Sequence, residues 1–300
     1  MAVITTGSHP KALWPGIAKW WGLKYDEQKQ VWTTLFETDT SDKNYEEVVE
    51  GTGFGLVPEK DQGANVSYDT EVQGHTTRFT HVVYGMGWIA TEEELEDNQY
   101  MEVAKRRTER LAFSLRCTDE TVHANHFNRA FNSSYLGGDG LEMVSTAHIT
   151  QDGTQSNELA TPADLSEASL EDLCVQIMNA KNSRGLRIML TPKQLVVPPN
   201  VHFDAKRILE SDQTPDTANN AKNIVGGMFK GGLVTWPYLS DTDAWFVTTD
   251  APAGLMHYWR RKPKFAQDND FDSGNAKAKV TSRYISKWGD WRGVYGSQGA

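Results

Sequence analysis

One segment of the chain carries the residue types of a metal site at helical spacing. Glu120, His123 and His126 recur every three residues, so a helix would place the three side chains on one side. A metal site built between helices needs a matching Glu or Glu-x-x-His on other helices, and the chain has no second copy. We interpret the three residues as a polar helix face, and a metal-dependent enzyme is the less favoured alternative.

Three other segments resemble ligand-binding or catalytic motifs, and each lacks a defining part. The glycine-rich residues 51–55 lead into a hairpin pattern instead of a helix, and no Walker lysine follows. His148 has no GxSxG motif before it, so we expect a loop histidine. Residues 268–274 begin like a calcium loop, but Ser273 and Lys279 replace its Gly and Glu. The sequence thus predicts no catalytic, cofactor-binding or metal-binding residue, and no enzyme.

The helix expected to carry the first motif is the strongest local signal in the chain. Thr91 can cap its start, with Glu94 placed to close a capping box, and no Pro or Gly interrupts residues 91–131. A continuous helix of this span would be a rod of roughly 60 Å, long enough to serve as the spine of an elongated subunit. Its mainly apolar stripe consists of Met101, Ala104, Thr108, Leu111, Leu115 and Val122.

Composition restricts the classes of protein that the chain could form. With 300 residues, 38% of them hydrophobic, it can bury a sizeable core, and no apolar run approaches the length of a membrane span. A net charge of −10 disfavours tight binding to nucleic acid, although the basic clusters at 105–107 and 260–262 allow weak contact. Cys117 and Cys174 form no motif, which is typical of unpaired thiols in a reducing compartment.

The N-terminal part lacks the pattern of a self-contained domain. Residues 1–50 mix tryptophans with polar residues at no regular period, which predicts an arm that lies along another surface. Residues 52–88 then alternate apolar and polar positions in two strands, 66–72 and 77–84, with a turn over 71–75. Such a hairpin is marginal alone, so we expect it to need a partner surface.

The C-terminal half mixes helices and strands without regular alternation, which predicts the α+β class. A helical face includes Leu170, Leu173, Cys174 and Ile177, so Cys174 should lie in a core. A further helix should run from Asn200 to Glu210. Predicted strands cover 187–190, 195–197, 233–236, 244–248, 255–259 and 280–286.

The last residues of the chain are unusually aromatic for a terminus. Trp288, Trp291 and Tyr295 stand among glycines, where most termini carry small or charged residues. Large rings contribute most when buried. We therefore expect this segment to dock on its own domain or on a neighbour.

The order of short segments along the chain resembles that of Mu-like major head subunits, a family of tailed-phage major capsid proteins. No single segment is a fingerprint, and the strength of the resemblance lies in their shared order over nearly the whole chain. The matching segments are residues 12–16, 45–47, 52–56, 68–71, 84–87, 195–199, 208–211, 242–246, 267–272 and 290–297.

This resemblance implies the Hong Kong 97-type capsid fold. Members of the family have an N-terminal arm, an extended hairpin called the E-loop, a peripheral domain with a long spine helix, and an axial domain. Carried over in order, these parts would occupy residues 1–50, 52–88, 89–164 and 165–270, and residues 271–300 would supply C-terminal strands that complete the subunit.

The implied function is that of a major capsid protein. It would self-assemble as hexamers and pentamers into an icosahedral shell around phage DNA, in the host cytoplasm and then in the virion. In such a shell the arm and the hairpin would bury their apolar residues on neighbouring subunits. About 50 residues precede the hairpin, which leaves no room for a scaffolding region, so we expect a separate scaffolding protein. A portal, decoration proteins and non-specific contact with packaged DNA are further expectations. The alternative is an encapsulin-type cellular compartment shell.

Overall fold

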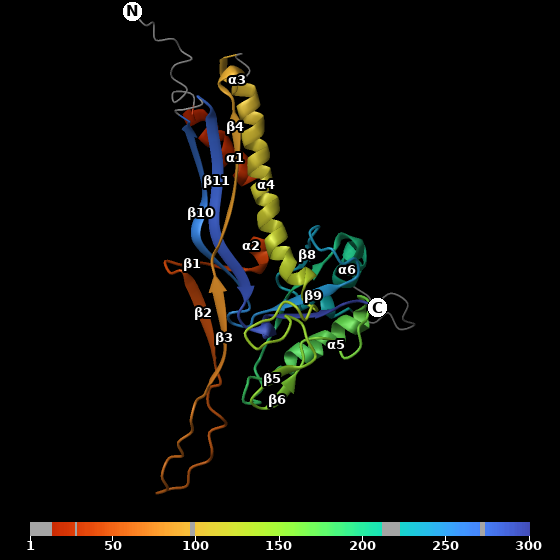
Figure 1. Ribbon diagram of the computed structural model, residues 1–300. Coiled ribbons are helices and arrows are strands. Elements are labelled where there is room, and N and C mark those ends of the chain that lie inside the picture. Colours follow the sequence, from red (N-terminus) through yellow and green to blue (C-terminus); the bar gives the residue numbers. More distant parts are fainter. Residues whose placement is uncertain (1–13, 28, 97–99, 212–222, 271–273) are drawn as a thin grey trace, which may run out of the picture.

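The computed structural model describes residues 14–27, 29–96, 100–211, 223–270 and 274–300 (Figure 1). A long, narrow sheet runs beside a long helix, and a looped hairpin extends from one end of this unit. A more compact region with its own sheet lies to the side, where the C-terminus also lies. Helices and strands do not alternate regularly along the chain, which confirms the predicted α+β class.

The long sheet has the strand order β1–β10–β11–β4. Strands β10 (Leu255–Asn269) and β11 (Ala276–Trp288) form one antiparallel pair, flanked by β4 (Val82–Ala90) and by the parallel β1 (Glu37–Thr40). Both central strands exceed the predicted 255–259 and 280–286, because a long partner supplies ladder hydrogen bonds even where the apolar pattern stops. The boundary expected between residues 270 and 271 therefore falls between two paired strands of one sheet.

The predicted spine helix is present as α4 (Tyr100–Asn128), preceded by the short α3 (Glu92–Glu96). Its 29 residues make a rod of about 44 Å, shorter than the span of 91–131 suggested. The Thr91 hydroxyl accepts a hydrogen bond from the backbone N of Glu94 (3.3 Å). The Glu94 carboxylate does not complete a capping box, because it accepts two hydrogen bonds from Arg107 (2.7 and 2.9 Å).

The hairpin at the end of the long sheet differs from the prediction. It consists of β2 (Tyr45–Gly51) and β3 (Gln73–Thr80), so its first strand lies in the segment expected to be arm. The predicted strand over 66–72 is wrong, and residues 52–72 form an irregular loop. An alternating pattern becomes a strand only where a partner pairs with it, and the loop has no such partner among the described residues.

The compact region is built on a second four-stranded sheet in the order β12–β9–β7–β8. Helices α5 and α6 pack against it, and Cys174 of α5 is buried as predicted, with burial raising its pKa to about 11. The elements of this region are β5 (His148–Thr150), β6 (Gly153–Gln155), α5 (Glu167–Met178), β7 (Pro192–Val197), α6 (His202–Glu210), β8 (Leu233–Thr235), β9 (Trp245–Thr249) and β12 (Val294–Ser297), with 3₁₀ turns at Pro199–Val201, Val225–Gly227 and Trp291–Gly293.

Two details of this region correct the sequence-based expectations. Residues 187–190 form no strand, since Arg187 makes only an isolated bridge to Lys181 and Met189 is 96% exposed. A short apolar run does not by itself create a ladder. The helix expected from Asn200 begins at His202, after the 3₁₀ turn, and no side chain caps it.

The arm packs on its own subunit in the part that the structure describes. Helix α1 (Trp14–Glu27) lies along α4 and β10, where Trp21 stacks on Phe265 (5.9 Å between ring centroids). Helix α2 (Trp32–Leu35) inserts Trp32 into the central core. The expectation that these rings are buried on a neighbour is therefore wrong for residues 19–36. Residues 1–13 lie outside the described part.

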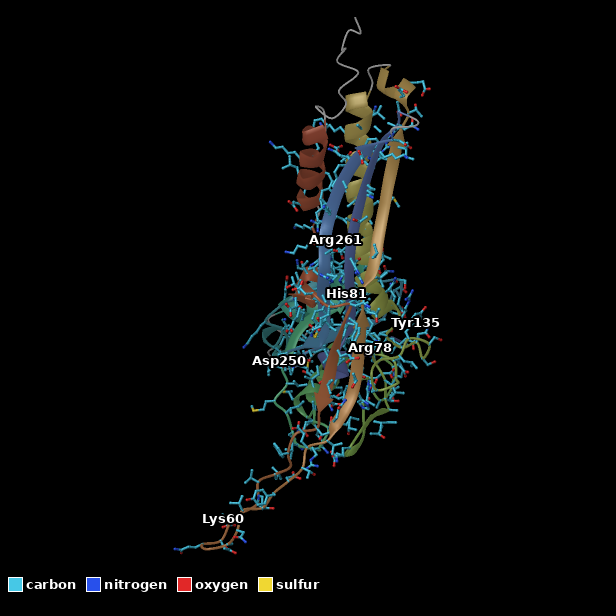
Figure 2. All side chains as sticks on the ribbon, turned by 60° about the vertical axis from the view of Figure 1, so that its left-hand side comes forward. Lys60, Arg78, His81, Tyr135, Asp250 and Arg261 are labelled. Carbon is cyan, nitrogen blue, oxygen red and sulfur yellow. The ribbon has the colours of Figure 1, made fainter. Side chains whose placement is uncertain are left out.

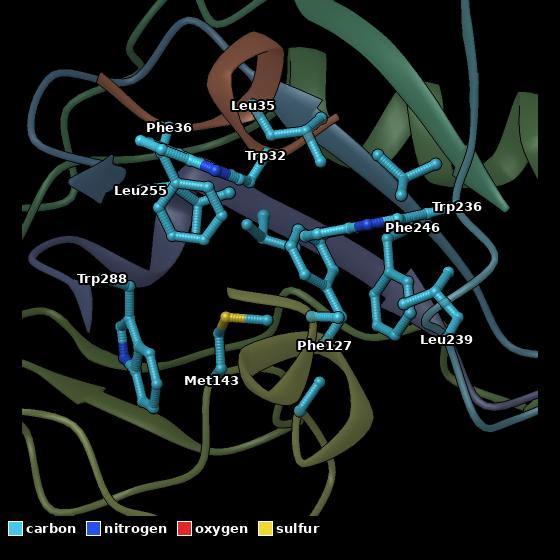
Figure 3. Close-up of a cluster of buried hydrophobic side chains, with 14 of the residues drawn as sticks. Trp32, Leu35, Phe36, Phe127, Met143, Trp236, Leu239, Phe246, Leu255 and Trp288 are labelled. Atoms are coloured by element: carbon cyan, nitrogen blue, oxygen red, sulfur yellow. The ribbon is translucent and has the colours of Figure 1, made fainter. Parts of the chain in front are cut away.

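The largest hydrophobic core joins the arm, the spine helix and both sheets (Figure 3). Edge-on aromatic contacts link Phe127 of α4 to Trp236 (5.6 Å) and to Phe246 of β9 (5.2 Å). Such contacts contribute beyond the area that they bury. Because this core includes residues from all four parts, the arm and the compact region are fixed to the long sheet.

The predicted docking of the C-terminal segment is confirmed. Trp288, Trp291 and Tyr295 are 6%, 6% and 1% exposed, and β12 pairs with β9 of the compact region. The side-chain amide of Asn157 donates hydrogen bonds to the carbonyls of Trp291 (3.1 Å) and Val294 (2.7 Å). The terminus therefore completes the subunit's own sheet.

Candidate functional site

The three residues of the metal-like motif point into the subunit and meet different partners. Glu120 accepts hydrogen bonds from the backbone N of Val31 (2.6 Å) and from the indole Nε1 of Trp236 (2.7 Å). His126 Nε2 lies 3.0 Å from the hydroxyl of Ser286. Within the described ranges, no three His, Cys, Asp or Glu side chains are grouped as a metal site would require. The polar face thus joins the spine helix to the arm and the sheet.

A buried histidine pair connects α4 to β10. His123 Nδ1 lies 2.6 Å from the carbonyl oxygen of Asp119, which can only accept, so His123 Nε2 is left as an acceptor. His257 Nδ1, 2.9 Å away, must then donate to it. Burial lowers the pKa of His123 well below its usual value and that of His257 to about 3. Both rings are neutral, and His257 Nε2 has no partner within the described part of the chain.

Asp119 joins the arm and the long sheet to the spine helix through two phenols. The fully buried carboxylate accepts hydrogen bonds from the hydroxyls of Tyr284 (2.9 Å) and Tyr25 (3.2 Å), and burial raises its pKa to about 6. Arg116 donates to the backbone carbonyl of Tyr25 (2.6 Å) and lies over its ring. No sequence motif marks this network, because its members come from three distant segments.

His148 is a buried structural residue, so the expectation of a loop histidine is wrong. Its Nδ1 lies 2.5 Å from Asp139 and its Nε2 lies 3.1 Å from the Asn157 side-chain oxygen. Its ring stacks on Trp291 with 4.3 Å between centroids. The residue starts β5 and joins that hairpin to the docked C-terminal segment. Asp139, Asn157 and Trp291 thus hold His148 in place within the fold.

In the residues that the structure describes, neither of the other two motif-like segments forms a ligand site. Residues 51–55 end β2 and enter an irregular loop, so no helix N-terminus is available to bind phosphate. Of residues 268–274, positions 271–273 lie outside the described part. Asp270 is paired with Lys277 (2.5 Å), and Asp268 also makes a contact.

Exposed apolar side chains gather on the loop of residues 52–72, which we call the hairpin loop. Leu56, Val57 and Tyr68 are 84%, 92% and 94% exposed. At its base, Thr52 and Val72 exchange hydrogen bonds of 3.0 and 3.1 Å. Beyond that closure the loop extends away from the subunit (Figures 1 and 2). Exposed apolar side chains of this size mark an interaction surface.

Polar contacts hold the base of the hairpin loop, the part next to β2 and β3, against the compact region. Asp69 accepts hydrogen bonds from the backbone N of Gly55 (2.8 Å) and from Arg184 (2.5 Å), which together lower its pKa to about 2. At the end of β2, Glu50 accepts a hydrogen bond from Ser183 and lies 3.4 Å from the guanidinium of Arg292. The loop base is therefore fixed, whereas the side chains near its tip meet solvent.

No helix among the described residues covers one face of the long sheet (Figure 1). Alternate residues of β11, from Ala276 to Tyr284, are buried toward α4 and α1, so the residues between them face the other way. The register places Arg283 opposite Arg261, near the middle of the sheet (Figure 2). The cations of this open face are Arg261, Lys264, Lys277, Lys279 and Arg283.

Residues 74–297 match the model of a family described as phage capsid protein. The chain belongs to the phage capsid protein family. No curated protein sequence matches this capsid protein. Solved structures match this capsid protein over nearly the whole length of the chain, at low sequence identity.

Three of these solved structures show how far the likeness extends. Mycobacterium phage Patience aligns with a TM-score of 0.55 at 12% identity over 99% of this chain and 89% of that chain. The capsid of Cyanophage P-SCSP1u aligns with a TM-score of 0.55 at 11% sequence identity, over 91% of this chain and 89% of that chain. A virus-like particle from Pyrococcus furiosus aligns with a TM-score of 0.50 at 10% sequence identity, over 95% of this chain and 99% of that chain. At these identities the likeness shows the fold, which is of the Hong Kong 97 type.

The capsid protein is a structural component of the virion and assembles into a shell of capsomers. It is not an enzyme, since its family consists of structural shell proteins. The family match also makes the encapsulin-type alternative less favoured. In the part of the chain that the structure describes, no helix is long and apolar enough to cross a membrane. Membership of the Mu-like subfamily stays a prediction.

Proposed function

We propose that this capsid protein forms the hexamers and pentamers of a closed shell, and that the hairpin loop is the main contact between neighbouring subunits. The observation that supports the proposal most directly is the exposure of Leu56, Val57 and Tyr68. Because these side chains are exposed in the subunit, they contribute nothing to its own fold. Burying a Leu or Val side chain stabilises by about 1.5–3 kcal/mol, so many copies of such a contact drive a shell to close.

The open face of the long sheet is the surface proposed to receive this loop. Near the tip, the hairpin loop carries Glu59 and Asp61 beside a single Lys60. Arg261 and Arg283 stand opposite each other on the open face, and like charges in that position destabilise a sheet. Acidic residues of a neighbour would relieve that repulsion. Apolar contact for the loop is available at Val83 and Ile89 of β4, which are both 57% exposed.

The division into parts is revised on the basis of the strand pairing. We propose an E-loop unit of residues 45–80, a peripheral unit that combines residues 81–131 with 255–288, and an axial unit that includes 159–251 with β12. The arm is the segment before residue 45. Apart from β1, which lies in the arm and pairs with β10 of the peripheral unit, these boundaries keep paired strands together, as cooperative folding units generally do.

Further partners proposed for the shell follow from the family resemblance. A separate scaffolding protein and a portal would act in assembly, and decoration proteins would bind the finished shell. Contact with packaged DNA would be non-specific. An acidic chain favours weak DNA contacts, because tight binding relies on clustered Lys and Arg.

The decisive experiment removes the loop without disturbing its base. Replacing residues 54–70 with a Gly-Ser linker keeps β2, β3 and the closure between Thr52 and Val72. We expect a folded subunit with an unchanged melting temperature that forms no shells in sedimentation or negative-stain microscopy. A control with serine at Leu56, Val57 and Tyr68 keeps the loop length and should also lose assembly. Closed shells in normal yield from either variant would contradict the proposal.

A further inference from the structure

A cavity of 440 Å³ lies where the end of α4, the segment after it and strands β4 and β11 meet. It is separate from the hairpin loop, and the function proposed above makes no use of it. Its lining includes three basic side chains, those of His126, Arg129 and Lys287. Among the described residues that line the cavity, none is Asp or Glu. This is unexpected in a chain with 40 acidic and 30 basic residues.

The two permanent charges of the cavity are positioned by aromatic rings. The Arg129 guanidinium lies 4.2 Å from the ring centroid of Tyr135, and Lys287 Nζ lies 5.8 Å from that of Trp288. Within the described ranges, neither side chain forms an ion pair. The acidic group that acts on Lys287 is Asp139, and this carboxylate is paired with His148 at 2.5 Å.

The three basic groups act on one another across the cavity. Burial, with the added effect of Lys287 and Arg129, lowers the pKa of His126 to about 4. Burial also lowers the pKa of Lys287. Lys287 is half-buried and Arg129 is exposed, so the two cations lie at an open cavity that has no acidic residue among its described lining residues. An anion bound there would balance their charge.

We propose that this cavity binds a phosphate group, held by Arg129 and Lys287. Two positive charges suit a phosphate group, which carries about −1.5 to −2 as a monoester near neutral pH and one charge in a nucleic-acid backbone. Arg supplies a planar pair of donors and Lys a point charge, and both suit phosphate oxygens. Asn125 and Ser134 add neutral donors at the lining. The volume is within the range of small-ligand pockets, about 300–1,000 Å³.

The test is calorimetric titration of the full-length protein with inorganic phosphate, at an ionic strength held constant with chloride. The double variant Arg129→Gln/Lys287→Gln should bind phosphate at least about tenfold more weakly, because two charge-assisted contacts are lost. Lys230→Gln removes one charge from an exposed residue outside the cavity and should bind like the natural protein. Thermal unfolding checks that each variant is folded.

The outcomes separate the possible sources of the phosphate group. Competition by a duplex oligonucleotide would support a nucleic-acid backbone as the source, and competition by a nucleoside monophosphate alone would support a free nucleotide. No phosphate binding, unchanged binding in the double variant, or an equal loss in Lys230→Gln would overturn the proposal. Shell formation is scored separately by microscopy, so failure here leaves the hairpin-loop contact untouched.

Discussion

The hairpin loop and the C-terminal segment are both rich in glycine and in large side chains, yet they have opposite surroundings. Residues 291–297 are all buried, whereas Leu56, Val57, Val66 and Tyr68 of the loop are 61–94% exposed. The C-terminal segment finds a ladder partner in β9 and completes the compact region. The loop closes on itself at Thr52 and Val72 and then leaves the subunit.

The difference shows how one kind of residue can serve two purposes. Apolar side chains that find a place in the subunit's own core stabilise its fold, as Tyr295 does. Similar side chains on an unpaired loop are left to a second subunit. Mutations in the two segments should therefore separate the free energy of folding from the yield of assembly.

The largest expected effect comes from a matched pair of tyrosines. Tyr295→Ala removes a ring that is 1% exposed, and truncating a large buried ring costs about 3–5 kcal/mol of the roughly 5–15 kcal/mol that stabilise a domain. Tyr68→Ala removes a ring that is 94% exposed and should leave the free energy of unfolding unchanged. Urea unfolding of the two variants measures both values. Deletion of residues 288–300 should leave an insoluble chain.

The same two variants should differ in another way when the yield of shells is measured. Tyr68→Ala subunits should fold normally and give fewer shells in sedimentation. A Tyr68→Ala variant that is destabilised as strongly as Tyr295→Ala would show that the hairpin loop belongs to the fold. The distinction between the two segments would then be lost.

A smaller loss is expected at the buried end of the metal-like motif. Glu120→Ala leaves the buried indole of Trp236 without its acceptor, at about 1–3 kcal/mol, and removes the acceptor of the part-buried backbone N of Val31. Glu59→Ala makes the same substitution on the exposed hairpin loop and should have little effect on stability. Chemical unfolding compares the two variants. Equal stability of both would mean that Glu120 does not fasten the arm.

Segments with a strong local pattern were predicted correctly from the sequence. The stripe of α4, the face of α5 with Leu170 and Leu173, and the aromatic C-terminal segment each carry their signal in consecutive residues. Several failures have a common cause, which is pairing with a distant partner. Residues 66–72 alternate but have no partner strand among the described residues, whereas Arg261 and Lys264 lie in a run without the pattern and still have partners on β11.

The buried network could not be read from the sequence for a related reason. Asp119 and His123 were visible only as polar residues of a helix, and their partners Tyr284 and His257 lie more than 130 positions away. Burial then changes their chemistry, since it keeps the imidazoles neutral and raises the pKa of the carboxyl. Neither effect can be predicted from the spacing of residues along the chain.

Acid should weaken the fold through these histidines. The pKa values of His123, His126 and His257 are lowered in the folded chain, so the unfolded chain binds their protons first as pH falls below about 6.5. Asp119 and Glu120 have raised pKa values and oppose this with at most two protons. His81, whose pKa is also lowered, adds to the three histidines, whereas Asp290 and Glu158 have raised pKa values and oppose them. Each histidine that is kept neutral in the fold contributes up to one proton near pH 5, a slope of about 1.4 kcal/mol per pH unit.

Urea unfolding at pH 7, 6 and 5 measures that slope. His257→Gln keeps an N–H that can donate to His123 and removes one titrating group. The slope of this variant should therefore fall by about one proton. A free energy of unfolding that stays constant from pH 7 to 5 in the natural protein would refute the neutral pair.

The smallest expected effect concerns the fixed base of the hairpin loop. Asp69→Asn and Arg184→Gln each remove the ion pair that holds the loop against the compact region. The Asp69 side chain is 44% exposed and that of Arg184 is 19% exposed, and a single ion pair at such a site contributes little, so the melting temperature should change only slightly. Trypsin should instead cleave faster after Lys60, which lies in the exposed part of the loop (Figure 2). Mass spectrometry of that fragment follows the rate.

Because the two substitutions remove one interaction, the double variant should be cleaved no faster than the quicker single variant. Asp61→Asn makes the same charge change elsewhere in the loop and is the control. If Asp61→Asn accelerates cleavage as much as Asp69→Asn does, net charge explains the effect and the ion pair does not hold the loop. If only the Asp69 and Arg184 variants respond, the loop base is fixed by its own subunit before any neighbour binds the tip.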